Sequence, residues 1–352
     1  MKRSVVVIAG GIGSRFWPLS RKSKPKQFLS SFNGKSFLRL AVERGLRYLN
    51  GEGNLYIVTN KAYENLVRQE APEAEIIFER KSLGTAGAIA LGMVRAKFDG
   101  ADQMLVMPAD HFVEDEGRLI QKFYEAEEIL NKTPTIIVFG HEPTFPHSGY
   151  GYIRKGAPID DRKDVFFVRR FFEKPSIERA KQYVDSGEYL WNMGIFMWKL
   201  QTLAQGFEDE LPEHYHATKI AEKILQEGGN WDQVLEQFEN LDPVSIDIGL
   251  IERARNICCV EMTGCGWSDI GSLNVWIDLV SKDQAERSFE HINLSSENVK
   301  VHASKGIVVT LGVNNLLVVV EKDTVLVCSL DKVQEVGKVP QILAERGLEE
   351  YI

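Results

Sequence analysis

The chain has 352 residues and a formal net charge of −8, from 42 basic and 50 acidic side chains. That balance disfavours non-specific binding to nucleic acid, whose phosphates attract basic proteins. No run approaches the ~18 consecutive apolar residues of a membrane-spanning helix. At this length we expect one large domain and a smaller one, with no nucleic-acid or membrane partner.

Apolar β-branched runs alternate with helical patterns along the first part of the chain. We predict strands at 4–8, 54–59, 75–78, 103–107 and 135–140, and helices at 37–49, 61–70, 85–97 and 119–130. This alternation predicts an α/β fold with a doubly wound, mostly parallel sheet. In such sheets ligands bind at the carboxyl ends of the strands.

The middle of the chain has a different pattern. Residues 145–200 hold turn signals and aromatic runs, and we predict antiparallel strands there that cover the edge of the sheet. Residues 200–238 have a helical pattern, and residues 242–280 return to strand and helix.

Short strands with regular spacing follow near the C-terminal end. We predict them at 299–303, 307–311, 316–320 and 325–329, followed by a helix at 339–346. Regular spacing of this kind is typical of a small β-solenoid or a β-meander. The charged stretch 281–289 is the predicted linker, which gives domains at 1–285 and 290–352.

The cysteines indicate a reducing compartment. Cys258, Cys259, Cys265 and Cys328 lack CxxC spacing, so we expect reduced, mostly buried thiols, with a zinc site as the alternative. The apolar run at the N-terminus is too short for a secretory signal. We therefore expect a cytoplasmic protein.

A glycine loop with dense positive charge follows the first strand. Gly10, Gly11 and Gly13 leave backbone N–H groups uncovered, so a phosphate chain can approach closely. Five basic residues follow within twelve positions, and we expect Arg15 and Lys26 to reach phosphate oxygens. The loop lacks the third glycine and the acidic partner of a dinucleotide fingerprint. A solvated basic turn is the alternative.

Two carboxylates are candidate ligands for Mg²⁺. Asp110 ends a predicted buried strand, and Asp269 lies in the glycine-bounded turn 266–271. Mg²⁺ takes one or two protein carboxylates and completes its shell with phosphate and water. The alternatives are a helix cap for Asp110 and a turn-closing role for Asp269.

Polar residues further along the chain suit a sugar phosphate. Gly149 begins the sequence GYGY, Glu173 and Lys174 lie in FEKP, and Asn192 follows Trp191. Glu173 and Asn192 can hydrogen-bond sugar hydroxyls, and Lys174 can hold a phosphate. Ordinary turn chemistry is the alternative.

These motifs resemble those of the nucleotide-sugar pyrophosphorylases, and most closely the form found in bacterial mannose-1-phosphate guanylyltransferases. The matching sequences, in order, are AGGIGSRFWPLSRKSKPKQFL (9–29), MPADH (107–111), GYGYI (149–153), FEKP (172–175), WNMGIF (191–196), SIDIGLIER (245–253) and GWSDIGS (266–272).

The resemblance implies transfer of GMP from GTP to mannose 1-phosphate, with Mg²⁺ as cofactor. It also implies a short left-handed β-helix after the catalytic domain, and a homodimer. The residues it assigns to the nucleotide are Ala9, Gly10, Gly11, Gly13, Ser14, Thr85 and Ala86, with Arg15, Lys26 and Lys174 as catalytic cations. It assigns Asp110 and Asp269 to the metal, and Asp110, Gly149, Glu173 and Asn192 to the sugar phosphate.

One segment departs from the bacterial mannose enzymes. Residues 82–89 read SLGTAGAI, where those enzymes have an RNTAPAI-like sequence. A sugar-1-phosphate nucleotidyltransferase with another base or sugar is therefore an alternative. A dinucleotide-dependent oxidoreductase and a non-catalytic nucleotide sensor are alternatives from other classes.

Overall fold

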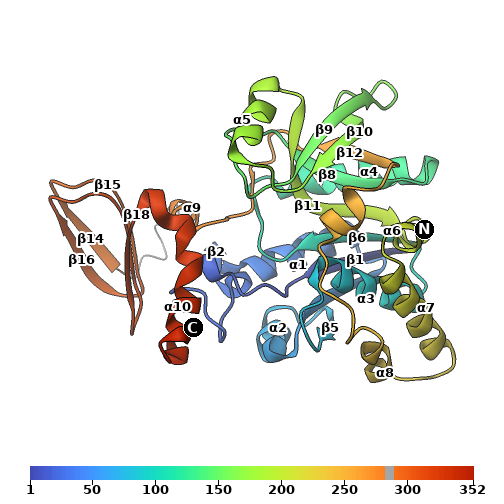
Figure 1. Cartoon of the computed structure of the whole chain (residues 1–352), viewed down its shortest axis with the longest axis horizontal. Coiled ribbons are helices and arrows are strands. Elements are labelled where there is room, and N and C mark those ends of the chain that lie inside the picture. Colours follow the sequence, from blue (N-terminus) through green and yellow to red (C-terminus); the bar gives the residue numbers. More distant parts are fainter. Residues whose placement is uncertain (282–288) are drawn as a thin grey trace. The chain divides into compact units, whose positions relative to one another are not determined.

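The computed structural model describes residues 1–281 and 289–352 (Figure 1). Residues 282–288, which hold most of the predicted linker, lie outside the described residues. The chain forms two compact units, and neither is a single continuous stretch. The larger unit comprises 1–10, 41–109 and 113–267; the smaller comprises 11–40, 110–112 and 268–352.

The larger unit is built on a nine-stranded sheet with the order β5-β4-β1-β6-β11-β8-β12-β10-β9. The strands are β1 (Arg3–Ile8), β4 (Asn54–Asn60), β5 (Glu75–Glu79), β6 (Gln103–Pro108), β8 (Ile136–His141), β9 (Tyr152–Pro158), β10 (Val165–Phe172), β11 (Tyr189–Lys199) and β12 (Ile257–Glu261). Only β10 and β11 oppose the common direction, which confirms the mostly parallel sheet.

Strand β11 corrects one prediction. It does not cover the sheet edge, because it lies between β6 and β8 and pairs antiparallel with both. Its residues are almost continuously buried, which is the pattern of a strand covered on both faces. The antiparallel strands β9 and β10 do lie at the edge, as predicted.

Helices of the larger unit pack on this sheet and on one another. They are α1 (Phe37–Leu49, which begins in the smaller unit), α2 (Glu64–Glu70), α3 (Gly84–Phe98), α4 (Glu116–Lys132), α5 (Ile177–Ser186), α6 (Leu200–Glu210), α7 (Pro212–Gln226), α8 (Trp231–Glu236) and a π-helix (Asp247–Ile251). Helix α3 is buried nearly all round, and at Gly92 a Cβ would lie 2.8 Å from Val6. The alanines and glycines of α3 therefore allow it to approach β1 closely.

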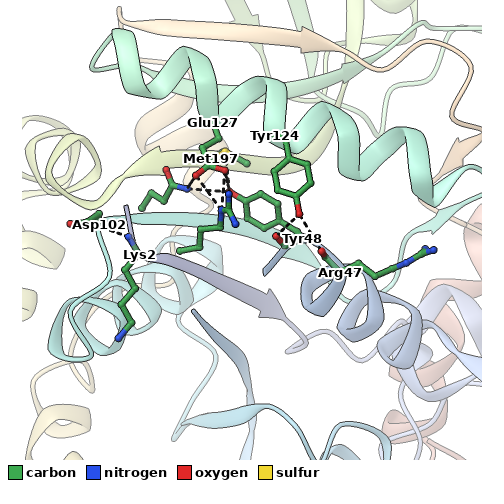
Figure 2. A network of polar contacts seen from close by, with 9 residues as sticks. Lys2, Arg47, Tyr48, Asp102, Tyr124, Glu127 and Met197 are labelled. Atoms are coloured by element: carbon green, nitrogen blue, oxygen red, sulfur yellow. Dashed lines mark hydrogen bonds and ion pairs between the residues drawn. The ribbon is translucent and has the colours of Figure 1, made fainter. Parts of the chain in front are cut away.

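A network of polar side chains links β1, β6, α1 and α4 (Figure 2). The carboxylate of Glu127 accepts hydrogen bonds from Arg3 Nε at 3.0 Å and Gln103 Nε2 at 2.7 Å. The Tyr48 hydroxyl lies 3.5 Å from the same carboxylate. The pair of opposite charges is mostly removed from water, so each charge depends on the other for compensation.

The smaller unit contains a coil of short strands: β14 (Phe289–Leu294), β15 (Glu297–Ala303), β16 (Gly306–Leu311), β17 (Asn314–Val320) and β18 (Val325–Ser329). β14 pairs parallel with β16, and β15 with β17, so successive turns of the chain stack as in a solenoid. This confirms the β-solenoid prediction for β15, β16 and β17, and β14 adds to their coil; its left-handedness stays a prediction. β18 returns antiparallel along β17, and β14 was missed from the sequence.

Residues 11–40 pack into this smaller unit through an apolar cluster. Phe16, Trp17 and Phe37 are buried in it with residues of the coil and of the following helices, including Leu317 and Val333. The remaining elements of this part are β2 (Ser30–Phe32), β3 (Lys35–Ser36), α9 (Leu273–Val280) and α10 (Val339–Glu345). Two further short strands are β7 (Phe112–Val113) and β13 (Trp267–Ser268), and 3₁₀ helices include Ser14–Phe16, Lys26–Phe28 and Leu330–Lys338.

None of the helices in the described parts of the chain combines the length and apolar character needed to cross a membrane.

We predict that Glu127→Ala lowers the free energy of unfolding by about 3 kcal/mol, because it leaves the Arg3 guanidinium without its carboxylate. The neighbouring Glu128→Ala is a matched control, since that side chain is 65% exposed and pairs at the surface with Arg162. It should cost about 0.5 kcal/mol or less. Urea unfolding followed by far-UV circular dichroism measures both. Equal effects for the two variants would contradict the role given to the network.

Candidate functional site

In the smaller unit, Lys26 packs against the backbone of the glycine loop at Ile12 and Gly13. Gly13 has a φ of 74°, and a Cβ there would lie 2.4 Å from the Cβ of Lys26. The Lys26 amide donates to the Ile12 carbonyl at 3.3 Å. Gly13 therefore has a positional role in this loop, because a side chain would displace Lys26.

The ammonium of Lys26 is held by oxygen atoms from two distant segments. Nζ donates to Asp110 Oδ2 at 2.7 Å and to the backbone carbonyl of Asp269 at 2.8 Å. It also lies 5.0 Å from the centre of the Phe16 ring. Lys26 is only 6% exposed, so these contacts compensate for the water that its charge has lost.

Asp110 is anionic in this arrangement. Burial opposes its ionisation, but the positive charges of Lys26 and His111 hold the pKa of Asp110 below its ordinary value. The Asp110 side chain remains 37% exposed on its other side. It can therefore accept a further cation or hydrogen-bond donor.

The predicted metal ligands meet at the lysine. The structure brings Asp110 and Asp269 to one ammonium, with Asp269 contributing its backbone carbonyl. Within 1–281 and 289–352, no group of three or more His, Cys, Asp or Glu side chains is arranged to hold a metal. The partly exposed, ionised Asp110 fits a Mg²⁺ ion that takes most of its ligands from phosphate and water. The assignment of both aspartates to the metal stays a prediction.

The other cations of the loop divide into two kinds. Arg15 is exposed, and Nη1 donates to Gln334 at 3.3 Å, while Ser14 and Gly11 are also exposed. Arg21 instead donates to Asp323 from both terminal nitrogens, one at 2.8 Å. This bidentate pair fastens the loop to the turn between β17 and β18, so not all of the local positive charge is available to a ligand.

In the larger unit, the predicted nucleotide residues Ala9 and Gly10 follow the carboxyl end of β1, and Thr85 and Ala86 lie in the first turn of α3. The Ala9 amide donates to Val58 at 2.8 Å, and a Cβ at Gly10 would lie 3.2 Å from Glu79 Oε2. Glu79 is 6% exposed, and burial raises its pKa to about 7. Among the residues that the structure describes, this carboxylate accepts one weak hydrogen bond, from the Leu83 amide at 3.4 Å.

The segment that departs from the bacterial mannose enzymes is fastened to residues 244–246. The Thr85 hydroxyl accepts a hydrogen bond from the Ile246 amide at 2.8 Å, and the Ala86 amide donates to Val244 at 3.0 Å. Gly84 has a φ of 70°, and a Cβ there would lie 2.4 Å from the Val244 carbonyl oxygen. Residue 84 must therefore be glycine, because a side chain would collide with the backbone of Val244. The Thr85 hydroxyl also has a structural role, since it accepts the hydrogen bond from Ile246, in addition to its predicted role at the nucleotide.

The predicted sugar residues Glu173 and Asn192 do meet in the larger unit. A Cβ at Gly151 would lie 2.7 Å from Glu173 Oε2 and 3.2 Å from the Cβ of Asn192. Burial and the charge of Asp247 raise the pKa of Glu173 to about 7, against the opposing charge of Lys174. Lys174 Nζ lies 3.2 Å from Glu173 Oε1 and is 65% exposed, so it can turn toward an anion.

Asp247 completes this group of side chains. Its carboxylate accepts hydrogen bonds from Asn192 Nδ2 and from the Ser245 hydroxyl, both at 2.8 Å. Burial raises the pKa of Asp247 even so. Gly149 lies on a separate turn, where its amide donates to His147 Nδ1 at 3.0 Å.

Sequence reasoning missed two carboxylates, Glu79 and Asp247. Asp247 lies inside the sequence SIDIGLIER, so the motif gave its position without giving it a role. For Glu79 the available signal was its place at the end of a predicted strand, immediately before the 82–89 segment. Perturbed carboxylates of this kind concentrate at functional sites.

Comparison with known proteins places this chain among nucleotide-transferring enzymes. The sequence model of the nucleotidyl transferase family matches residues 4–286, and that of the MannoseP isomerase/GMP-like beta-helix domain matches residues 289–343. A Salmonella muenchen protein named mannose-1-phosphate guanylyltransferase is 34% identical over 358 residues, covering 98% of this chain and 74% of that protein. A protein of the same name from Escherichia coli (strain K12) is 34% identical over 364 residues, with the same coverage.

A solved structure from Thermus thermophilus is similar over nearly the whole chain. It is described as a mannose-1-phosphate geranyltransferase and is 32% identical, with a TM-score of 0.84. The match covers 98% of this chain and all of that one.

We predict that Glu79→Gln stabilises the protein more at pH 8 than at pH 5. The pKa of Glu79 is about 7 when folded, against an ordinary 4.5, so the folded state keeps a proton that the unfolded state loses. Native stability therefore falls as pH rises through this window, by an amount on the order of 3 kcal/mol. Glutamine does not ionise and escapes this loss.

Urea unfolding of Glu79→Gln at both pH values measures the difference, with the exposed Glu52→Gln as control. The same shift in both variants, or none in either, would show that Glu79 does not carry this cost.

Proposed function

Because the chain belongs to the nucleotidyl transferase family, with bacterial mannose-1-phosphate guanylyltransferases among its relatives, we propose that it transfers GMP from GTP to mannose 1-phosphate. GDP-mannose and pyrophosphate are the products. The observation that carries the proposal is the ion pair between the buried Lys26 and the partly exposed Asp110, beside the glycine loop. It joins a fixed cation to an ionised carboxylate, as phosphate transfer with a metal requires.

The proposed reaction needs no general base. An oxygen of mannose 1-phosphate attacks the α-phosphorus of GTP, the bond from that phosphorus to the bridging oxygen breaks, and pyrophosphate leaves with the electron pair. The second pKa of a phosphate monoester is about 6, so the nucleophile is already anionic near neutral pH. The difficulty is the repulsion between two anions.

The chain's cations would offset that repulsion. We assign Lys26 and Arg15 to the triphosphate and Lys174 to the phosphate of the sugar. Two contacts of Lys26 to oxygen leave one of its three donors for a phosphate oxygen. Asp110, with Asp269, would hold Mg²⁺, which supplies neutralisation of charge on the phosphates.

Glu79 is our candidate for selecting guanine. The Watson–Crick edge of guanine presents two adjacent donors, N1–H and the N2 amino group, and one carboxylate can accept from both. Adenine presents a donor beside an acceptor, which would place a lone pair against the carboxylate. The raised pKa of Glu79 indicates that this carboxylate lacks strong donors of its own.

Glu173, Asn192 and Asp247 are assigned to the mannose hydroxyls. Asn192 and Asp247 hold each other in place at 2.8 Å, and Glu173 stands over Gly151, where a Cβ would clash. A fixed set of acceptors can distinguish the orientation of one hydroxyl from another. Hydrogen bonds from the sugar hydroxyls would also stabilise the negative charges of Glu173 and Asp247, which burial and mutual repulsion disfavour.

We also propose that the protein acts as a homodimer in the cytoplasm. Strands β14 and β16 present an exposed apolar face formed by Ile292, Leu294, Ile307, Val309 and Leu311, with exposures of 38–69%. Val309 pairs with Ile292 and Leu311 with Leu294, so the side chains form one continuous ladder. A second copy of the chain would cover it, because monomers rarely expose contiguous apolar patches of this kind.

We predict that pyrophosphate release with Mg²⁺ is dominated by GTP with mannose 1-phosphate, in a cross of GTP, ATP, UTP and dTTP against mannose 1-phosphate and glucose 1-phosphate. EDTA should abolish it. Glu79→Gln should reduce the preference for GTP over ATP by at least 10-fold, since a bidentate pair is worth ~1–3 kcal/mol of discrimination. Preference for another pair would contradict the specificity, and no release with any pair would contradict the reaction.

We predict that Lys26→Met lowers kcat by about 10²–10³, by analogy with the loss of one donor that stabilises developing charge. Methionine keeps the apolar stem in contact with Phe16. The exposed Lys24→Met removes a charge from the same loop and should leave kcat within a factor of two or so. Near-normal turnover of the Lys26 variant would remove Lys26 from the mechanism.

We predict that Leu311→Glu yields a monomer, because a charge in an apolar interface is desolvated without a partner. Sedimentation velocity measures the mass in solution. Gln226→Glu, an exposed substitution of the same charge in α7, should leave the assembly unchanged. A monomeric unsubstituted protein, or a dimeric Leu311→Glu, would contradict the proposed interface.

A further inference from the structure

A cavity of about 870 Å³ lies in the larger unit. It is lined by the start of β8, the end of β11, one side of α6, Leu250 of the π-helix and the chain between that helix and β12. Its lining residues include Ile136, Lys199, Gln205, Leu250, Arg253 and Arg255. Volumes of this size accommodate small-molecule ligands.

The cavity is separate from the residues assigned to the sugar. β8 and β12 run parallel and both begin at the cavity, whereas the antiparallel strand β11 ends there at Lys199. Asn192 lies seven residues earlier in β11, at most about 23 Å away at a rise of ~3.3 Å per residue, since the strand has an irregularity between Asn192 and Phe196. The cavity is therefore at the opposite end of β11 from Asn192.

The cavity has positive charge without a partner in the protein. Among the residues that the structure describes, the side chains of Lys199, Arg253 and Arg255 have no hydrogen bond or ion pair, and the two arginines are exposed to water. The lining from α6 is acidic: Asp209 and Glu210 line the cavity, and Asp209 accepts a hydrogen bond from Gln205 at 3.0 Å. The cations and the carboxylates thus face the cavity from different elements.

We propose that this cavity binds a phosphorylated sugar. Its phosphate or diphosphate would pair with Arg253, Arg255 and Lys199, because arginine forks match phosphate oxygens. Its hydroxyls would donate to the carboxylates of α6. Apolar surface from Leu250 and Ile136 would pack against the ring. A simple anion would leave the acidic wall unused, and a neutral sugar would leave the cations unused.

Binding at the cavity reaches the sugar residues through one short helix. Leu250 lies in the π-helix and packs against α6, where a Cβ at Gly206 would be 2.9 Å from Leu250 Cδ1. The same helix begins at Asp247, whose carboxylate holds Asn192. A ligand seated on Leu250 and Arg253 therefore acts on the element that positions Asp247. This coupling rests on the proposed function, whereas the binding itself does not.

Two probes test the binding by isothermal titration calorimetry. Mannose 6-phosphate represents a sugar monophosphate, and GDP-mannose represents a sugar diphosphate, which would also occupy the catalytic site. We expect one or both to show a site that Arg253→Ala/Arg255→Ala weakens at least 10-fold. Lys181→Ala/Lys223→Ala, which removes two exposed charges elsewhere in this unit, should have no such effect. Thr202→Trp, which fills the cavity without removing charge, should also weaken the site.

The outcomes separate the ligand sources. If the arginine variant loses binding of mannose 6-phosphate only, the site takes a sugar monophosphate. If the variant loses one of two binding sites for GDP-mannose, the site takes a sugar diphosphate. Equal binding of both probes by unsubstituted protein and by the arginine variant overturns the proposal. In pyrophosphate-release assays, mannose 6-phosphate should change KM for mannose 1-phosphate at least threefold in unsubstituted protein only, whereas GDP-mannose should change KM more in unsubstituted protein than in the arginine variant, where only its competition at the catalytic site remains. Unchanged KM with intact binding overturns the coupling alone.

Discussion

The arrangement of the smaller unit depends on burying the apolar side chains of residues 11–40. Phe16, Trp17 and Phe37 join an apolar cluster with the C-terminal coil, and Trp17 Nε1 donates to the Tyr351 carbonyl at 2.7 Å. This packing fixes a loop that would otherwise be a mobile basic turn. It also allows Lys26 to stand almost wholly out of water, which is tolerable only because Asp110 and the Asp269 carbonyl compensate its charge. A catalytic role for the loop therefore depends on the coil that packs beneath it.

The larger unit holds carboxylates at buried positions, where ionisation is unfavourable unless hydrogen-bond donors approach them. Burial raises the pKa of Glu79 and of Glu173 to about 7, and it raises the pKa of Asp247 as well. Each of these groups would be more stable if hydrogen-bond donors approached it. Guanine and mannose are both rich in donors, whereas phosphate is not. The larger unit thus holds several perturbed carboxylates that can accept hydrogen bonds, as functional sites commonly do.

Local patterns predicted the elements better than their pairing. The helix at 37–49 was predicted with its observed bounds, and the strands of the parallel core within one or two residues. These segments have strong apolar periodicity that owes nothing to distant contacts. The insertion of β11 between β6 and β8 was not predictable in this way, because it depends on pairing across the whole chain. β14 was missed because the three apolar residues of FEHINL do not alternate regularly with its polar ones, and its pairing with β16 depends on residues later in the sequence.

The residues of the candidate site could likewise be predicted only where their signal is local. The contacts of residues 244–247 could not be predicted, because they join segments far apart in the sequence. Glycine, lysine and aspartate motifs gave the loop, Asp110 and Glu173, because their chemistry is local. Thr85 is fastened to Ile246, and Asn192 to Asp247, across separations that no motif spacing reveals. One short segment therefore holds a residue assigned to the nucleotide and a residue assigned to the sugar. Under the proposed assignments, a displacement of this segment would disturb Thr85 and Asn192 together, because Ile246 and Asp247 are bonded to them.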